Sequence, residues 1–298
     1  MRKQFFAMNR ILVTGASGQL GTELRLLAGN DARFVWTDAI ESKEILPLDI
    51  CDADALERLC LEQDVNTILN LAAYTNVDGA ESDVARCMAI NAEAPRQMAR
   101  IASRRDWSLV QISTDYVFDG NRKRGAYRES DPCHPLSVYG SSKREAELAI
   151  RRIAPRGAII RTAWLYSPFG KNFVRTMLRL GSEKPEISVV ADQTGTPTYT
   201  RDLAAALLKM LPQIGSRRAE IYHFTDEGTC TWFDFAAAIM TYASLPCKVH
   251  PIVTAEYPTP ATRPQYSLLD KSKIRNDFGV ETPWWSTSLR HCLSRISL

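Results

Sequence analysis

The segment Arg10-Ile11-Leu12-Val13-Thr14 is a short run of apolar and β-branched residues that leads directly into a glycine-rich turn, Gly15-Ala16-Ser17-Gly18-Gln19-Leu20-Gly21. The run predicts a buried strand, and residues 21–28 are expected to form a helix. Glycines between a strand and a helix let backbone N–H groups approach a pyrophosphate closely. The spacing is Gly-x-x-Gly-x-x-Gly rather than Gly-x-Gly-x-x-Gly, so on this motif alone a plain tight turn stays an alternative.

Strand and helix patterns alternate after this turn. Strands are expected at 34–37, 67–71, 108–112 and 158–161, and helices at 52–61, about 83–104 and about 141–152. This alternation predicts an α/β fold, a Rossmann-type doubly wound parallel sheet with helices on both faces.

The alternation of strand and helix patterns ends after Arg161, where proline-rich loops begin. A smaller C-terminal substrate-binding lobe is expected to interleave with a helix at 201–211 and a strand at 221–224 that return to the main sheet. The expected division is 9–165 with 196–226 for a dinucleotide-binding domain, and 166–195 with 227–298 for the lobe. Residues Met1–Ala7 precede a second methionine and are left out of the fold prediction.

The composition narrows the class of protein. Hydrophobic residues make up 45% and charged residues 24%, as in an ordinary globular protein, and the net charge of +3 is spread along the chain, so no nucleic-acid partner is expected. No apolar run reaches the ~20 residues of a membrane span, and no secretory signal begins the chain, so a cytoplasmic protein without a membrane partner is expected. The seven cysteines lie far apart without a Cys-x-x-Cys pair, so free thiols and no metal are expected.

Asp38 stands 20 residues after Gly18, at the expected end of the second strand. A carboxylate there can accept hydrogen bonds from the adenosine ribose and repels a 2′-phosphate, which favours NAD, although Lys3 and Lys43 leave NADP open. Polar and small residues follow two further strands at the edge where ligands bind in such sheets, and strand-end capping is the alternative for each of them. The expected cofactor is NADH or NADPH, bound by Gly15, Ser17, Gly18, Gln19, Leu20, Asp38, Asp49, Ile50, Leu71, Ala72, Ala73, Tyr139 and Lys143.

Tyr139 and Lys143 are four residues apart, which places a phenol and an ammonium on one face of a helix. A nearby cation favours phenolate and is expected to move the tyrosine pKa toward the working range. Such a pair also occurs by accident in many helices. Thr114 adds a hydroxyl at the end of the strand at 108–112, where it can hydrogen-bond a carbonyl that is being reduced. The glycine turn, the hydroxyl and the Tyr/Lys pair have the order and spacing of short-chain dehydrogenases.

The chain resembles the dTDP-4-dehydrorhamnose reductase family of extended short-chain dehydrogenases from Asn9 onward. Besides the turn and the Tyr/Lys pair, the matching segments are 70–78, Ala80-Glu81, Asn91, 113–120, 161–166, Asn172-Phe173, 192–198 and 257–264. The resemblance implies hydride transfer from NADH or NADPH to C4 of dTDP-4-dehydrorhamnose, giving dTDP-L-rhamnose.

The same resemblance implies the roles of individual side chains. Tyr139 would protonate the nascent alkoxide, Lys143 would lower the tyrosine pKa and hold the nicotinamide ribose, and Thr114 would polarise the ketone. The implied catalytic residues are therefore Thr114, Tyr139 and Lys143, and the implied substrate-binding residues are Val77, Thr114, Asp115, Trp164, Asn172 and Arg263. Arg263 would bind the substrate diphosphate with two donors at once. The alternative for Trp164 is a core residue without a role in binding, and the alternative for Arg263 is an ordinary surface residue.

Other functions stay open. Related dehydratases carry an Asp-Glu pair after the threonine, whereas this chain has Asp115-Tyr116, so dehydration is not expected. A reductase or epimerase of another nucleotide sugar is an alternative, as is a non-catalytic NADP-binding subunit similar to the beta subunit of methionine adenosyltransferase. Some family members form homodimers with an interface magnesium. Glu23 matches one ligand position, but Arg201 and Arg295 fall near the others, so no metal is expected.

Overall fold

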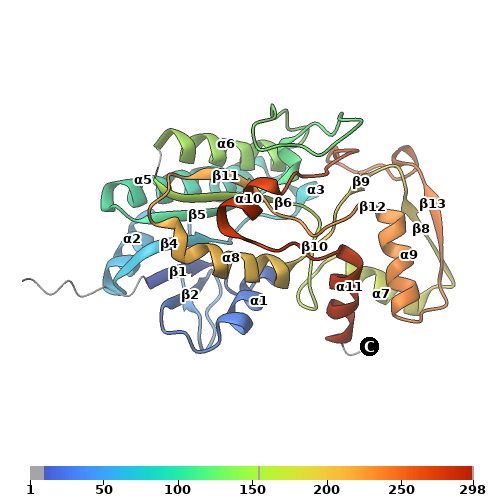
Figure 1. The fold of residues 1–298 in the computed structure, drawn as a ribbon, viewed down its shortest axis with the longest axis horizontal. Helices are drawn as coiled ribbons and strands as arrows, with labels where there is room; N and C mark the ends of the chain where they lie inside the picture. Colours follow the sequence, from blue (N-terminus) through green and yellow to red (C-terminus); the bar gives the residue numbers. More distant parts are fainter. Residues whose placement is uncertain (1–9, 154, 297–298) are drawn as a thin grey trace, which may run out of the picture.

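The computed structural model describes residues 10–153 and 155–296 (Figure 1), so Met1–Ala7 and Asn9 lie outside it. Its main sheet contains β1 (Arg10–Thr14), β2 (Phe34–Asp38), β3 (Leu46–Pro47), β4 (Val65–Asn70), β5 (Ser108–Thr114), β6 (Arg156–Thr162) and β11 (Glu220–His223). The order is β11-β6-β5-β4-β1-β2-β3, and every pair is parallel. The expected Rossmann-type doubly wound sheet is confirmed.

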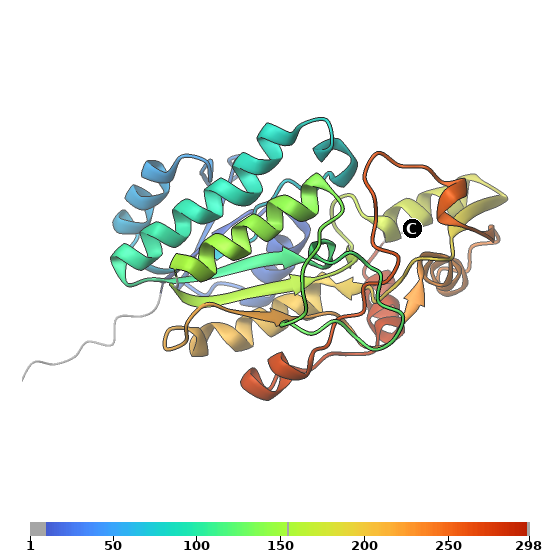
Figure 2. The same cartoon turned by 90° about the horizontal axis from the view of Figure 1, so that it is seen from above.

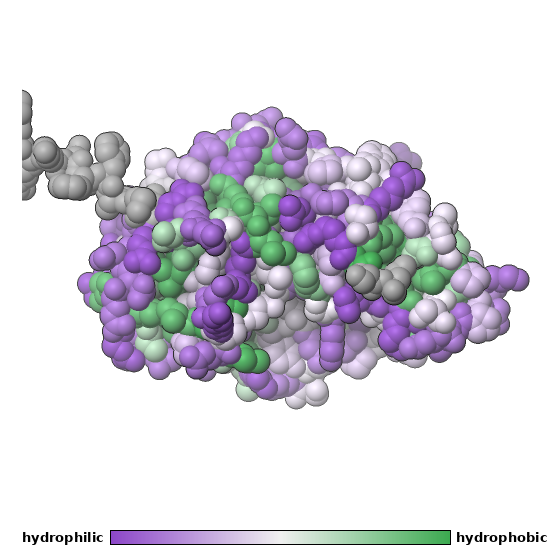
Figure 3. Space-filling view, turned by 90° about the horizontal axis from the view of Figure 1, so that it is seen from below, coloured by the Kyte–Doolittle hydropathy of each residue, from purple (hydrophilic) through white to green (hydrophobic). Residues whose placement is uncertain are grey.

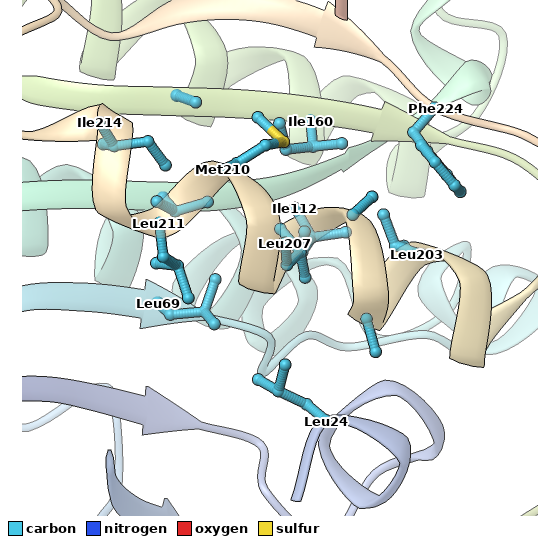
Figure 4. Close-up of a cluster of buried hydrophobic side chains, with 14 of the residues drawn as sticks. Leu24, Leu69, Ile112, Ile160, Leu203, Leu207, Met210, Leu211, Ile214 and Phe224 are labelled. Atoms are coloured by element: carbon cyan, nitrogen blue, oxygen red, sulfur yellow. The ribbon is translucent and has the colours of Figure 1, made fainter. Parts of the chain in front are cut away.

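Helices cover both faces of this sheet (Figure 2). One face carries α2 (Ala53–Glu62), α5 (Ala94–Arg105) and α6 (Val138–Ile153), and the other carries α1 (Gln19–Ala28) and α8 (Thr200–Ile214). On the second face, buried side chains of α8 pack against the sheet, as Figure 4 shows for Leu203, Leu207, Met210, Leu211 and Ile214 beside Leu69, Ile112 and Ile160. The burial of these apolar side chains stabilises the packing of the helix layer on the sheet.

The helix expected at 83–104 is interrupted. It consists of α4 (Val84–Met88), a π-helical turn η1 (Ala89–Glu93) and α5. The side chain of Asn91 in η1 accepts a hydrogen bond from Tyr74 N at 2.9 Å and donates one to Tyr74 O at 3.0 Å. The π turn therefore fixes the loop that follows β4, in keeping with the frequent placement of such turns at functional sites.

A second group of elements lies at the other end of the molecule (Figure 1). It contains β7 (Leu165–Tyr166), α7 (Phe173–Glu183), β8 (Glu186–Val190), β9 (Thr194–Gly195), β10 (Thr198–Tyr199), β12 (Cys230–Thr231), α9 (Trp232–Tyr242), β13 (Lys248–Ile252), η3 (Thr254–Glu256) and α11 (Trp285–Ser294). Most of these share a separate apolar core that includes Tyr166, Phe235 and Leu289. In contrast, α10 (Ser272–Phe278) lies beside β11 and α8, and its Ile274 and Phe278 belong to the core of the main sheet (Figure 1). The division at 165/166, 195/196 and 226/227 stays a prediction.

Two short elements complete the description near the site, α3 (Val77–Ala80) and the 3₁₀ turn η2 (Asp115–Val117). Within residues 10–153 and 155–296, no helix is long and apolar enough to cross a membrane. The face shown in Figure 3 mixes hydrophilic and hydrophobic residues.

Candidate active site

The carboxyl ends of β1, β2, β4, β5 and β6 open onto one cleft of about 770 Å³. Strands of a parallel sheet point the same way, so the loops that follow them gather at one edge. The lining includes every expected cofactor-binding and catalytic residue, and every expected substrate-binding residue except Arg263. The structure thus brings these side chains together, while their individual roles stay predictions.

The glycine turn fits a pyrophosphate. Gly15 has a φ of +67°, and a Cβ there would lie only 2.7 Å from the backbone nitrogen of Ala72. A side chain is therefore excluded both by the backbone conformation and by the loop after β4. Gly18 precedes α1 without a side-chain cap, so backbone N–H groups of the first turn remain for an anionic ligand.

Asp38 lies at the end of β2 and contacts the glycine turn. Its carboxylate accepts hydrogen bonds from Ser17 N at 2.9 Å and from Ala39 N at 2.7 Å. These bonds hold the carboxylate at the rim of the cleft beside the turn. This is the place where a ribose would follow a pyrophosphate seated on α1.

Gln19 joins the glycine turn to the loop that precedes α7. Its side-chain oxygen accepts from Ser167 Oγ at 3.2 Å and from Asn172 Nδ2 at 3.0 Å, and its Nε2 donates to Lys171 O at 3.4 Å. Asn172 also caps α7 by accepting from Arg175 N at 3.1 Å. Asn172 thus lies in the cleft wall, but its amide group is already engaged in holding this loop against Gln19.

The catalytic candidates come from β5 and α6. Thr114 ends β5, and Tyr139 and Lys143 occupy successive turns at the start of α6. All three side chains line the same cleft. Lys143 is 3% exposed, and burial lowers its pKa to about 8.

The expectation that the pKa of Tyr139 moves toward the working range is wrong for this structure. Burial raises the pKa of Tyr139 above its usual value, and the side chain of Thr114 opposes this only in part. The physical reason is that removing a phenolate from water costs more here than its neighbours return. Tyr139 is consequently a neutral phenol at neutral pH, which is the form that can donate a proton.

Asp115 follows Thr114 and is 2% exposed. Its Oδ1 accepts from Thr114 Oγ1 at 3.1 Å, whereas its Oδ2 has no hydrogen-bond partner among the residues that the structure describes. Burial raises the pKa of Asp115 to about 6. An unsatisfied carboxyl oxygen at the cleft wall suits a ligand hydroxyl.

Trp164 forms another part of the wall. Its φ of +50° is unusual for a bulky residue, and its ring stacks on Trp232 with a centroid separation of 3.6 Å and an interplanar angle of 11°. A Cβ on Gly195 would lie 2.8 Å from the Trp164 ring. Both the strained backbone and the close glycine indicate that the ring is held in a fixed position.

Arg263 is the exception to the prediction, because it lies outside the main cleft. It lines a second cavity of about 680 Å³ between α7, β8 and the loop around Tyr257. Its guanidinium donates to Asp78 Oδ2 at 2.8 Å, to Thr259 Oγ1 and to Ala261 O at 3.1 Å. Trp232 lines the same cavity and stacks on Trp164 of the first, so the aromatic pair lies between the two spaces.

Several residues at these cavities were not predicted as site residues. They are Thr75, Tyr116 and Lys171 in the first and Phe173, Gln193, Trp232 and Tyr257 in the second. Trp232 opens α9 directly after the capping residue Thr231, and the apolar pattern of α9 gives no sign that its first residue faces a cavity.

Glu23, the residue that matched a metal position, is fully buried on α1. Its carboxylate contacts Arg201 NH1 at 3.3 Å and also pairs with Arg295, and Tyr199 Oη donates to it at 3.4 Å. Two guanidinium groups therefore neutralise this carboxylate. The described part of the chain holds no group of three or more His, Cys, Asp or Glu side chains suited to a metal ion.

Known proteins are similar to this chain in sequence and in fold. The family model described as RmlD substrate binding domain matches residues 8–298. The chain is similar to a dTDP-4-dehydrorhamnose reductase of Aggregatibacter actinomycetemcomitans, at 40% identity over 95% of this chain and 98% of that protein.

Two solved structures are similar over almost their whole length. A dTDP-4-dehydrorhamnose reductase of Clostridium acetobutylicum superposes with a TM-score of 0.89 at 38% identity, covering 96% of this chain and 98% of that one. One of Bacillus anthracis, in complex with NADP, gives 0.86 at 36% identity, covering 96% and 99%. The chain therefore belongs to the dTDP-4-dehydrorhamnose reductase family.

Proposed function

We propose that the protein reduces the C4 keto group of dTDP-4-dehydrorhamnose to give dTDP-L-rhamnose, with NADH or NADPH as the reductant. The observation that carries this proposal is the meeting of Thr114, Tyr139 and Lys143 with the glycine turn in one cleft. The names of the similar proteins support the substrate, and the NADP in the Bacillus anthracis structure supports the cofactor class.

A reduced nicotinamide dinucleotide supplies the hydride when bound. The chain contributes the binding groups: the turn at Gly15 and Gly18 and the N-terminus of α1 hold the pyrophosphate, and Asp38 accepts hydrogen bonds from the ribose. Gln19, with the loop that it contacts, covers the glycine turn. These groups leave the opposite end of the cleft, at β5 and α6, for the nicotinamide and the sugar.

Thr114 and Tyr139 then act on the keto oxygen. The Thr114 hydroxyl donates a hydrogen bond that stabilises the developing negative charge, and Tyr139 transfers its proton to that oxygen. The raised pKa of Tyr139 keeps the phenol protonated before the step. The Lys143 ammonium, one turn further along α6, stabilises the phenolate left behind and binds the nicotinamide ribose.

The substrate would span the two cavities. Val77, Asp115 and Trp164 wall the sugar, and Asn172 lies beside them at the Gln19 contact. The nucleotide end would pass the Trp164/Trp232 pair and bring its diphosphate to Arg263, whose donors are now engaged by Asp78, Thr259 and Ala261. A diphosphate would compete for these donors as the stronger acceptor.

Turnover tests the proposal directly. NADH and NADPH oxidation is measured with a panel of 4-keto-6-deoxy sugar nucleotides, and product is identified by chromatography. We expect turnover with the dTDP-linked 4-ketosugar. Saturable cofactor binding without turnover on any member would instead favour the non-catalytic subunit, and turnover only on another sugar would revise the substrate. A cytoplasmic location and a homodimer also stay predictions, for fractionation and light scattering to test.

A further inference from the structure

Glu147 lies one helical turn after Lys143 on α6. Tyr139, Lys143 and Glu147 recur every four residues, so their side chains follow one another along one face of the helix. Glu147 is fully buried and does not line the cleft. We infer that Glu147 is a positioning residue for the reduction: its carboxylate holds the Lys143 ammonium in its charged form and fastens α6 to the catalytic end of β5. This inference rests on the proposed function.

Four hydrogen bonds hold the Glu147 carboxylate. Oε1 accepts from Ser113 Oγ at 2.6 Å and from Arg161 Nε at 2.8 Å, and Oε2 accepts from Arg161 NH2 at 2.7 Å and from Arg144 NH1 at 2.8 Å. Arg161 thus binds both carboxylate oxygens, and neither of these two side chains is exposed to solvent. A bidentate pair fixes orientation as well as distance.

These bonds join α6 to two neighbouring strands at one register. Ser113 on β5 and Arg161 on β6 are directly paired in the sheet, and Thr114 is the next residue along β5. Glu147 therefore fixes the position of α6 along the direction of β5. The position of α6 along β5 in turn sets the separation between Thr114 on the strand and Tyr139 on the helix, which line the same cleft.

Arg161 is itself held in place. NH1 contacts His223 Nε2 at 3.3 Å, NH2 donates to Cys133 Sγ at 3.2 Å, and the guanidinium lies 4.9 Å from the centre of the Phe118 ring. Burial and the Arg161 charge keep the pKa of His223 well below its ordinary value, so the ring is neutral and can accept. The carboxylate of Glu147 consequently has one arrangement.

The charge of Glu147 supports that of Lys143. Burial lowers the pKa of Lys143 to about 8, and Glu147 is the principal group that opposes this. The Arg161 bonds keep the pKa of Glu147 below its ordinary value, so it carries its charge throughout the working range. Other ionisable groups also lie on the elements around Lys143. They include Tyr139 on α6, Arg144 bound to Glu147, Cys87 and Arg86 on α4, Asp115 and Tyr116 on η2, Asp78 on α3 paired with Arg263, Glu81 bound to Val138 N, and Glu93 paired with Arg96.

The test compares Glu147→Gln with Glu145→Gln, the same change at an exposed position of the same helix. Lys143 is titrated in the full-length protein by NMR with carbon-labelled lysines, and Lys143→Arg assigns its signal. Removing a charge one helical turn away is expected to lower the Lys143 midpoint by about one pH unit in Glu147→Gln, with no shift in Glu145→Gln. An unshifted midpoint in folded Glu147→Gln would overturn the inference. This readout needs no substrate, so it stands apart from failure of the proposed function.

Activity provides the second readout. The alkaline limb of the pH profile of kcat/KM is expected to move to lower pH by the same amount in Glu147→Gln. The rate that is lost because Lys143 loses its proton should return as the pH is lowered. A merely structural role would lower the rate equally at every pH and leave the limb in place. If Glu147→Gln does not fold because Arg161 is left unpaired, Glu147→Gln/Arg161→Gln removes both charges. Its Lys143 midpoint is expected to fall in the same direction, and an unchanged midpoint would refute the inference.

Discussion

The Gly15→Ala substitution tests whether the glycine turn is a cofactor cradle. Gly15 has a φ of +67°, and a Cβ would meet Ala72 N at 2.7 Å, about 0.7 Å short of the 3.4 Å at which ordinary contact begins. The left-handed backbone costs an alanine about 1–2 kcal/mol. The close contact is with backbone, which cannot rotate away, so the turn must also move by several tenths of an ångström. Such a movement would break at least one N–H bond to a pyrophosphate, worth about 1.5–3 kcal/mol, or roughly tenfold to a hundredfold in affinity.

Gly29→Ala is the matched control. Gly29 has a φ of +58° at the end of α1, but a Cβ there would meet nothing within 4 Å. Both variants should have a lower free energy of unfolding, measured by urea denaturation, because an alanine is strained at a positive φ. Only Gly15→Ala should weaken NADH and NADPH binding, followed by energy transfer from tryptophan to the nicotinamide. If both variants bind the cofactor equally well, the cradle assignment is refuted.

Two further substitutions test the substrate side and the buried carboxyl. Arg263→Ala should raise the KM for the sugar nucleotide on the order of tenfold or more and leave the cofactor KM unchanged, because a charge-assisted bond to the diphosphate is lost; an equal rise for both, or the same rise in Asp78→Asn, would show that Arg263 only holds α3. Burial raises the pKa of Asp115 to about 6, so the folded protein retains a proton that the unfolded chain releases near pH 4, and stability falls between these values. In urea denaturation, the free energy of unfolding of Asp115→Asn should therefore rise relative to that of wild type by up to about 3 kcal/mol as the pH is raised from about 4 to about 8. If the difference between the two proteins does not change with pH, the burial argument is refuted.

The order of strands and helices could be predicted because each element of the main sheet carries its own local pattern. The apolar runs of β1, β4 and β5 are buried on both faces, as parallel strands covered by helices must be. The edge strand β3 consists of only two residues, Leu46 and Pro47, and both are exposed, so it has no apolar pattern to detect. The π turn at Ala89–Glu93 was missed for a different reason: its Asn91 bonds to Tyr74, 17 residues away, and such a tertiary contact has no local pattern.

The site was predictable where it depends on strand ends and helix spacing. Thr114 ends β5, and Tyr139 and Lys143 follow the periodicity of α6, so both positions are local properties. Arg263 was expected at the substrate diphosphate from its motif, but the motif could not show that Asp78, 185 residues away, holds it in a second cavity. The pKa of Tyr139 was predicted in the wrong direction, because spacing indicates a nearby cation but not the degree of burial.

The most direct test of the central claim is NADH and NADPH consumption with a dTDP-linked 4-keto-6-deoxy sugar by wild type and by Tyr139→Phe. Loss of one hydroxyl leaves the ring to pack and the T-shaped contact with Tyr116, so the melting temperature and cofactor affinity should be close to wild type. The rate should fall by about 10²–10⁴-fold, the usual contribution of a general acid. Comparable rates in the two proteins would exclude Tyr139 as the proton donor, and no wild-type rate on any such substrate would contradict the assignment as a reductase.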